Sequence, residues 1–547
     1  MAAPRTHEPP PARPRVAVDA AADAVAIVAL LVVALAMLLG FRHRGGMADP
    51  DAINMAAAMA HGLQPGVPFM DSMQYGRLIS PAVYYAFHWL SPLIGPDPSR
   101  TVGFLNALAL AAGVLLAWPL FALYRRRFTT APAFACSLIV LLTPLVWEVG
   151  CSFHPAGPAA LLLLLAILAH GRSGRSPAGI LWFAAGAALG FAALCTRAEV
   201  ALVAPALLLA ASFARERARA LAAAAASIAL AVAGFLLVAH GVSVATGGGP
   251  GGLATYGGGF IATYWRAAVL PSTVVWTTFT MGVATAALTV IGLVATWAGR
   301  DNRVAADPIA RRGLRVALVW ALPTILFWLP NQAFMVRHFL LAVPALAWIV
   351  AETLLTRVTR RALVALTATI VIANLLIPEA LYAAWNRTHP AHAKAPNGTF
   401  FSWHRREAAL IERYRRISDV VLGGRSGVVA GGAAPFAGAF VQVDWGSNGY
   451  LLLGMARRPE VYVLLSTATP FPGATLYRYR LGEAEVDLLM SQIAWPIEPG
   501  PLLEPARAVL NREAGTARRA GRAVVLPREV VAARVLADDG GPPALAY

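Results

Sequence analysis

The sequence predicts an all-α polytopic membrane protein of about 11 transmembrane helices, followed by a small C-terminal extracytoplasmic α/β domain. Three observations support this fold class. Of the 547 residues, 58% are hydrophobic and 13% are charged, whereas a soluble domain carries about 25% charged residues. Apolar runs long enough to cross a bilayer recur from residue 22 to about residue 383. Beyond that point they give way to shorter segments of mixed polarity.

The predicted spans follow from the length of each apolar run. A helix that crosses the hydrocarbon core needs about 20 predominantly apolar residues, and the segments 156–170 and 199–213 are short by this criterion. No convincing small-residue cleavage site follows the first run, so we interpret it as an uncleaved span rather than a signal peptide. The predicted spans lie near residues 22–41, 101–123, 130–148, 156–170, 178–196, 199–213, 220–240, 272–298, 314–330, 338–356 and 362–383.

Arginine-rich loops predict the orientation in the membrane. Positive residues collect in cytoplasmic loops, and the arginine clusters occupy alternate loops, on the same side as the Arg-bearing N-terminus. We therefore expect a bacterial inner (cytoplasmic) membrane protein with its N-terminus in the cytoplasm. The formal charge of +17 is explained by these loops and gives no reason to expect nucleic acid as a partner. The clusters are YRRRF at 124–128, GRSGR at 171–175, ARERAR at 214–219, the segment 300–315 and TRVTRR at 356–361.

Three regions are expected along the chain. Residues 1–21 are rich in Pro and Arg and are predicted to be a disordered cytoplasmic N-terminus. Residues 22–384 form the transmembrane domain, with a long first outer loop at 42–100. Residues 385–547 form the extracytoplasmic (periplasmic) α/β domain. In that domain SWHRREAALIERYRRISDVVLGG (402–424) and GEAEVDLLMSQI (482–493) predict helices, and SGVVAGG (426–432) and EVYVLLS (460–466) predict strands.

The first outer loop holds the most informative polar residues. In DPDAINMAAAMAHG (49–62) a proline stands at a plausible helix start, and Asp51 follows in the first turn, where a carboxylate is electrostatically favoured. In MQYGRLISPAVYYAFHWL (73–90), Arg77 precedes the motif Pro-Ala-Val-Tyr-Tyr at 81–85. An acid and a base therefore occur together in one loop outside the membrane.

Further polar residues stand at the outer ends of predicted spans, and no Asp, Glu, Lys or Arg falls at the centre of a span. Because charges inside the bilayer mark ion or proton pathways, this distribution argues against an ion-coupled transporter. Simpler roles remain open: an Asp at a helix start often only caps the helix, an arginine at a span end often only snorkels to the interface, and interfacial tyrosines often form an aromatic belt. The residues at the outer ends are Glu148, His154, Arg197, Glu199, Asn331, Arg337 and His338.

In their order along the chain, these features resemble a known family. A first span is followed by an outer loop with an acid at the head of an amphipathic helix (Pro50-Asp51-Ala52), then by a basic residue before Pro-x-x-Tyr-Tyr and a second span. The segments GFAALCTRAEVALVAPALLL (190–209) and VRHFLLAVPALAWIVA (336–351) continue the likeness. The pattern covers about residues 22–383. It is similar to the membrane-embedded GT-C glycosyltransferases that use polyprenyl-phosphate sugars, such as protein O-mannosyltransferases and the aminoarabinose transferase of lipid A.

The sequence departs from the family pattern at three places. Ala52 stands where the family has a second acid, and His154-Pro155 replaces an acid-containing motif before the fourth span. Two lysines of the family pattern are replaced by Arg77 and Arg197. These departures bear on the metal dependence and on the identity of the donor.

The resemblance implies transfer of a hexosyl or pentosyl group from a polyprenyl-phosphate donor to an extracytoplasmic acceptor, which is a lipid, a glycan or a protein. A carboxylate within hydrogen-bond reach can take the proton of the attacking hydroxyl, and a single displacement inverts the anomeric centre. Asp51 is the expected general base, and Asp49 is the second candidate.

The resemblance also implies residues that bind the substrates. The lipid phosphate gains negative charge as it leaves, and the planar fork of arginine fits phosphate oxygens. The expected donor phosphate-binding residues are Arg77, Arg197, Arg337 and His338. The candidates for orienting the acceptor or holding a divalent cation, Mg or Mn, are Glu148 and His154. The aromatic residues expected in the cavity are Tyr75, Tyr84 and Tyr85.

Two other functions fit parts of the pattern. A transporter or flippase for lipid-linked glycans would handle the same ligands, although transporters more often show paired repeats and broken helices. A noncatalytic assembly protein acting through its outer domain is the other alternative. The long first outer loop with Asp51 favours the enzyme.

Overall fold

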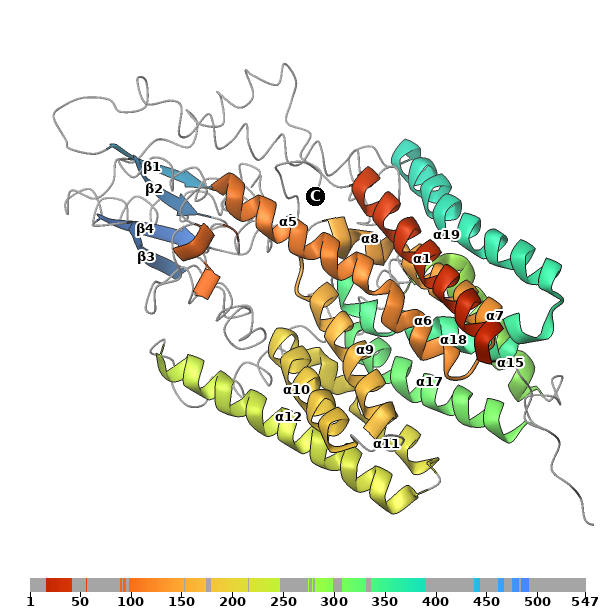
Figure 1. Ribbon diagram of the computed structural model, residues 1–547. Helices are drawn as coiled ribbons and strands as arrows, with labels where there is room; N and C mark the ends of the chain where they lie inside the picture. Colours follow the sequence, from red (N-terminus) through yellow and green to blue (C-terminus); the bar gives the residue numbers. More distant parts are fainter. Residues whose placement is uncertain are drawn as a thin grey trace, which may run out of the picture.

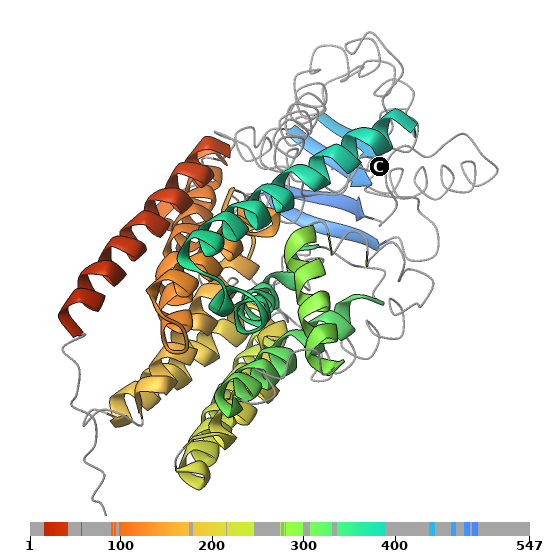
Figure 2. The same ribbon diagram turned by 90° about the vertical axis from the view of Figure 1, so that its right-hand side faces the viewer.

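The structure is a computed structural model with helices as far as residue 388 and four strands beyond them (Figures 1 and 2). Several of the helices lie roughly side by side, and the strands form a layer of their own. The residues that the structure describes are 16–41, 56, 89–90, 92–94, 98–151, 153–173, 179–214, 216–245, 274, 278, 281–298, 307–330, 336–388, 437–442, 461–466, 475–481 and 484–490.

The helical part consists of α-helices joined mostly by short connections, with 3₁₀ segments at some of the joints. The α-helices are α1 (Val16–Phe41), α5 (Pro98–Leu115), α6 (Ala117–Arg125), α7 (Thr130–Leu141), α8 (Pro144–Cys151), α9 (Ala156–Ser173), α10 (Gly179–Thr196), α11 (Ala204–Ser212), α12 (Arg217–Ala245), α15 (Val283–Trp297), α17 (Pro308–Trp328), α18 (Val343–Thr353) and α19 (Arg360–Thr388). The 3₁₀ segments are η2 (Ala198–Val203), η4 (Val336–Leu341) and η5 (Leu355–Arg357).

Within the described residues, five stretches of helix are long and apolar enough to cross a membrane. Large apolar side chains are exposed on their outer faces, for example Val28 on α1 and Leu237 on α12, as expected of surfaces that meet lipid. Several apolar helices are thus confirmed, whereas the total of about 11 spans stays a prediction. The five stretches are Ala20–Gly40, Arg100–Arg125, Gly179–Thr196, Arg217–Gly241 and Arg360–Ala380.

Prolines explain two breaks in the helices. α5 and α6 are separated at Leu116, because Pro119 has no N–H to donate to the carbonyl one turn earlier. The predicted span 130–148 is instead two helices, α7 and α8, bent by 61°. The residue before Pro144 is disfavoured in the α conformation, so the helix ends there and restarts. The bend redirects the chain just before the α8–α9 connection, which carries His154.

α18 lies in the core of the bundle. Every residue of α18 except Trp348 is buried, and the helix packs against α7, α15 and α17. Two side chains from neighbouring helices bond to carbonyls at its beginning: Tyr124 Oη donates to Pro344 O (2.8 Å), and Trp320 Nε1 donates to Leu341 O (2.8 Å). Both bonds satisfy buried polar groups and fix the depth of α18, and with it the position of η4.

Three consecutive arginines at the end of α6, Arg125 to Arg127, bond to three different parts of the bundle. Arg125 Nε donates to Asp23 Oδ1 of α1 (2.8 Å). Arg126 donates from Nη1 to Ile167 O (3.1 Å) and from Nη2 to Leu168 O (2.5 Å), both on α9. These arginines, which the sequence offered only as topology signals, therefore also cross-link helices.

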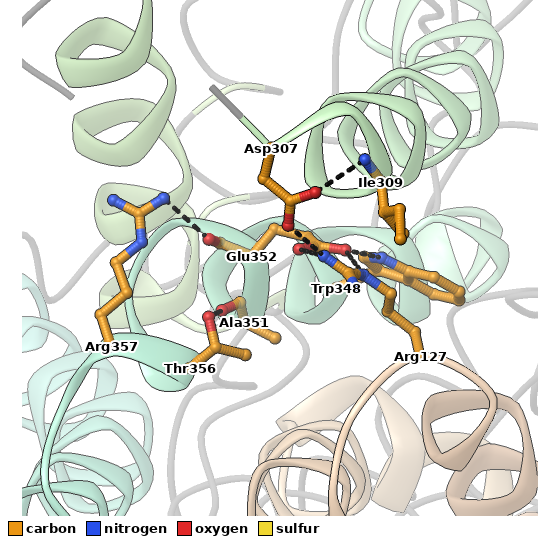
Figure 3. Close-up of polar contacts among 8 residues, drawn as sticks. All are labelled: Arg127, Asp307, Ile309, Trp348, Ala351, Glu352, Thr356 and Arg357. Atoms are coloured by element: carbon orange, nitrogen blue, oxygen red, sulfur yellow. Dashed lines mark hydrogen bonds and ion pairs between the residues drawn. The ribbon is translucent and has the colours of Figure 1, made fainter. Parts of the chain in front are cut away.

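The third arginine, Arg127, forms a forked ion pair with a buried acid of α18 (Figure 3). Its Nε donates to Glu352 Oε1 (2.7 Å) and its Nη2 to Glu352 Oε2 (2.9 Å), and Nη2 also reaches Asp307 Oδ2 (3.4 Å). The Glu352 side chain is 1% exposed and that of Arg127 23%. Trp348 Nε1 donates to the same carboxylate (3.3 Å). Loops that the arginine pattern places on one side of the membrane thus meet at one end of the bundle.

α15 begins with a cap supplied by another helix. Asn374 of α19 accepts at Oδ1 from Ala284 N (2.8 Å) and Thr285 N (3.3 Å), and its Nδ2 donates to Thr285 Oγ1 (2.9 Å). These are N–H groups that a helix start leaves without an intrahelical partner. Gly282, at φ 94°, allows the close approach, since a Cβ there would come within 2.6 Å of Asn374. The cap ties α15 to α19.

The strands form one mixed sheet. They are β1 (Ala437–Gln442), β2 (Val461–Ser466), β3 (Thr475–Leu481) and β4 (Ala484–Met490), in the order β1-β2-β4-β3. β1–β2 and β2–β4 are parallel, and β3–β4 is antiparallel. The strand predicted in EVYVLLS is β2. The segments 402–424 and 426–432 lie outside the described residues, so the helical half of the predicted α/β domain stays a prediction.

The helix predicted for GEAEVDLLMSQI is wrong, because its residues 484–490 form β4. The apolar residues Val486, Leu488 and Met490 alternate with Glu485 and Asp487, which is the two-residue period of a strand. β4 pairs with β3 after only two intervening residues, a separation typical of a hairpin. Pairing with β3 and β2 decides between the helical period and the strand period. Neither partner strand can be identified from this segment alone.

Candidate functional site

Polar side chains from three separate connections meet at one end of the bundle. His154 lies between α8 and α9, Arg197 lies between α10 and η2, and η4 carries Arg337 and His338. α9 packs against both η2 and η4, and α17 also contacts both segments. The four side chains are buried, with 4–8% of each residue exposed. The cluster therefore collects four of the residues that the sequence predicted for the donor and acceptor sites.

Arg197 is held by an acid that the sequence analysis did not include in the site. Arg197 Nε donates to Glu199 Oε2 (2.7 Å), and Nη2 donates to the other carboxylate oxygen. Arg197 has an extended backbone (φ −151°, ψ 117°) that ends α10, and Glu199 follows in the first turn of η2. The side chains of Arg197 and Glu199 are only 9% and 13% exposed, so this arginine does not snorkel to the interface.

The same guanidinium also faces two histidines. Arg197 Nη2 lies 2.9 Å from His338 Nδ1, and Nη1 lies 3.4 Å from His154 Nε2. His338 Nδ1 is also 3.1 Å from Glu199 Oε1. One ring nitrogen cannot accept from Arg197 and donate to Glu199 at the same moment, so the position of one proton decides which bond forms. The His338 ring lies against Trp328, with ring centroids 3.7 Å apart.

His154 presents a donor to Arg197 rather than an acceptor. Its Nδ1 accepts a hydrogen bond from Ala156 N (3.1 Å), so the neutral ring carries its proton on Nε2. Burial, and then the charge of Arg197, keep the pKa of His154 well below its usual value. Two donors, Nε2–H of His154 and Nη1–H of Arg197, therefore face each other. An acceptor oxygen about 2.9 Å from both nitrogens would satisfy both.

Arg337 and Glu148 lie on elements that are in contact with each other, η4 and α8. Arg337 directly precedes His338 in η4 and is 4% exposed, and Glu148 lies on α8, which packs against η4. The other predicted site residues, namely Asp49, Asp51, Tyr75, Arg77, Tyr84 and Tyr85, lie outside the described residues. The part of the site built around Asp51 therefore stays a prediction.

The described residues do not fit the divalent cation considered from the sequence. No group of three or more His, Cys, Asp or Glu side chains that could hold a metal occurs in the part of the chain that the structure describes. His154, one of the two metal candidates, faces the Arg197 guanidinium through Nε2, and a cation would be repelled there.

Sequence reasoning missed Trp328, and it placed Glu199 at the outer end of a span beside Arg197 without giving it a role in the site. The short spacing of opposite charges in TRAEV was a usable signal for the role of Glu199. Trp328 at the end of α17 gave none, because its contact with His338 depends on how α17 and η4 meet.

Comparison with known proteins supports the family resemblance. Residues 80–242 match the sequence model of the family described as dolichyl-phosphate-mannose-protein mannosyltransferase. That segment includes His154, Arg197 and Glu199. No relative with a matching sequence is found among the curated proteins.

Two solved structures have a similar course of the chain. ArnT from Cupriavidus metallidurans bound to undecaprenyl phosphate is 16% identical, with a TM-score of 0.48, over 87% of this chain and 99% of that one. The oligosaccharyltransferase AglB from Archaeoglobus fulgidus, in complex with an inhibitory peptide and a dolichol-phosphate, is 13% identical, with a TM-score of 0.46, over 81% of this chain and 64% of that one. The family match supports a membrane glycosyltransferase that uses a lipid-phosphate sugar donor. The resemblance to the polyprenyl-phosphate-dependent glycosyltransferases, first indicated by the motifs, is thus confirmed through residues 80–242.

Proposed function

We propose that this protein transfers a hexosyl or pentosyl group from a polyprenyl-phosphate donor to an extracytoplasmic acceptor, which is a lipid, a glycan or a protein. The observation that carries the proposal is the pair of converging donors, Arg197 Nη1 and His154 Nε2, 3.4 Å apart in a buried cluster. Buried donors of this kind call for an acceptor, and a phosphate oxygen is an acceptor with negative charge.

The reaction follows from where charge develops. The acceptor hydroxyl attacks the anomeric carbon of the sugar and forms the new C–O bond, while its proton passes to the Asp51 carboxylate. The bond between the anomeric carbon and the phosphate oxygen breaks, and the polyprenyl phosphate leaves with the electron pair. Arg197 and His154 donate to the phosphate as its charge grows. Arg337, directly before His338 in the chain, adds positive charge to the electrostatic field at the phosphate. A single displacement of this kind inverts the anomeric centre.

A flippase for lipid-linked glycans is less well supported. Among the described residues, the buried charged side chains gather in two groups, the cluster around Arg197 and the ion pair of Arg127 with Glu352. Apart from scattered hydroxyl and amide side chains such as Ser137, Thr324 and Asn374, the described core is apolar, which does not favour a passage for a charged head group.

The test is turnover of defined donors by the purified, detergent-solubilised protein. A panel of polyprenyl-phosphate sugars is incubated with the protein and a membrane extract that contains acceptors, with and without a chelator, and free polyprenyl phosphate is measured by mass spectrometry. We expect release from at least one donor, and loss of release in Arg197→Gln with the fold retained. If the folded wild-type protein consumes none of the donors and binds none of them, the proposed function is wrong.

A further inference from the structure

We propose that Glu199 is an internal counter-anion that competes with the lipid phosphate for Arg197 and thereby speeds release of the spent polyprenyl phosphate. The inference rests on the proposed function and deepens it, because it assigns Glu199 a role in how the same site lets go of its product.

The Arg197 guanidinium is shared between Glu199 and two histidines. Arginine has five N–H donors, and the pair on Nε and one Nη forms the fork that best fits a carboxylate or a phosphate. In Arg197 that fork is occupied by the two oxygens of Glu199, and the second N–H of Nη2 faces His338. Only Nη1 is directed at His154 and the space beside it. A phosphate therefore meets Arg197 at its Nη1 side, or displaces Glu199 to reach the fork.

Glu199 is both accessible from outside the cluster and tethered close to Arg197 by the chain. The side chain of Glu199 is 13% exposed, against 9% for Arg197 and 7% for His338, so the carboxylate is the most accessible member of the three. Glu199 is only two residues from Arg197, in the first turn of the 3₁₀ segment that begins directly after Arg197. A displaced carboxylate thus remains within reach of the guanidinium and can return as soon as the phosphate moves.

The lipid phosphate carries more negative charge in the product than in the sugar donor. The sugar donor is a phosphodiester with one negative charge, whereas the product is a monoester that carries about −1.5 to −2 at pH 7. A cationic cluster without a counter-anion would hold the more highly charged product more tightly than the donor. A tethered carboxylate opposes this trap, since its repulsion of the phosphate grows with the charge on the phosphate.

A purely structural role makes a different prediction. If Glu199 only neutralised Arg197 and held it in place, its removal would leave a buried, mispositioned cation, and phosphate binding would weaken. A competitor predicts tighter binding. The direction of the change in affinity therefore separates the two roles.

The experiment measures binding of undecaprenyl monophosphate to the full-length protein in detergent, by native mass spectrometry or a displacement assay. Glu199→Gln keeps the shape and removes the charge. We expect it to bind the lipid about tenfold more tightly, which corresponds to about 1.4 kcal/mol, and to turn over more slowly under excess donor because product release is slowed. The matched control is Glu352→Gln, which removes the charge of a buried glutamate paired with Arg127 rather than with Arg197 and should leave lipid affinity unchanged.

Two further variants keep the inference testable. If Arg197 is the group being competed for, Glu199→Gln should have no effect on affinity in an Arg197→Gln background. If Glu199→Gln does not fold, Glu199→Asp, which shortens the reach of the carboxylate, should still tighten binding by a smaller factor. A wild type that binds and turns over, with a folded Glu199→Gln variant that binds equally or more weakly, overturns this inference and leaves the proposed function intact. Failure of both folded proteins to bind the lipid overturns both.

Discussion

Replacement of Arg127 by Gln should destabilise the protein more than replacement of its partner, Glu352, by Gln. The two side chains form a forked pair with N–O distances of 2.7 and 2.9 Å, but their surroundings differ: the Glu352 side chain is 1% exposed and that of Arg127 23%. Without Arg127, a carboxylate remains buried with the Trp348 N–H as its remaining side-chain donor among those described. Without the carboxylate, Arg127 still reaches Asp307 and water.

The magnitude follows from this asymmetry. Breaking a fully buried ion pair by removing one partner costs about 3–5 kcal/mol, whereas an exposed pair contributes about 0–1 kcal/mol. Because Arg127 is partly exposed, we place Arg127→Gln at about 2–4 kcal/mol and Glu352→Gln at about 1–2 kcal/mol on the same scale. In the double variant neither charge is left alone, so it should be more stable than Arg127→Gln.

The assay is thermal unfolding in one detergent, followed by intrinsic tryptophan fluorescence at a fixed scan rate. The thermal midpoint should be highest for the wild type, followed by Glu352→Gln, the double variant and Arg127→Gln. Equal midpoints for the double variant and Glu352→Gln also agree with this expectation. A control, Arg126→Gln, loses the hydrogen bonds to the carbonyls of Ile167 and Leu168 on α9 and should shift the midpoint least. If Arg127→Gln melts with the wild type, or if the double variant melts below Arg127→Gln, the reasoning from the buried carboxylate is refuted.

Three other predictions concern separate parts of the molecule. Asn374→Ala removes the cap of α15 and leaves the N–H of Ala284 without its acceptor, which should cost about 1–2 kcal/mol and lower the thermal midpoint; an unchanged midpoint would contradict the capping role. Asp51→Asn should abolish sugar transfer while the protein remains inserted and still binds the lipid phosphate, and full activity would remove Asp51 from the mechanism. The lowered pKa of His154 means that the unfolded chain binds a proton near pH 6.5 that the folded protein does not. Stability should therefore fall as the pH drops below about 6.5 and level off above it. In His154→Gln the stability should depend less steeply on pH between pH 5 and 7.5. Equal slopes for the wild type and the variant would show that another group binds the proton.

Much of the helical architecture could be predicted from the apolar runs. The runs at 220–240 and 362–383 correspond to α12 and α19, which extend a few residues further at each end because polar residues can complete a helix beyond the apolar stretch. Run length alone could not show that 130–148 is two helices, although Pro144 marked the place. The strand β4 was mistaken for a helix because its pairing partners are distant in sequence or joined to it by a turn.

The candidate site could be predicted only as a set of loops. The alternation of arginine clusters groups the connections that carry His154, Arg197 and His338, and the structure brings these three together. Which atoms meet could not be predicted, because the contact of Arg197 with His338 joins residues 141 positions apart. The pairing with Glu199 depends on one extended residue between α10 and η2, and a pattern based on helix periodicity passes over such a residue.

The arginines at the end of α6 also set an order for biosynthesis. Arg125 bonds to Asp23, which lies 102 positions earlier in the chain. This ion pair can therefore form as soon as the loop between α6 and α7 has been synthesised. Arg127 must wait for Glu352, 225 positions later. At roughly 5–20 residues per second, the ribosome needs on the order of 10–45 s to supply that carboxylate. During this interval the nascent first half carries a guanidinium that has no counterpart from α18.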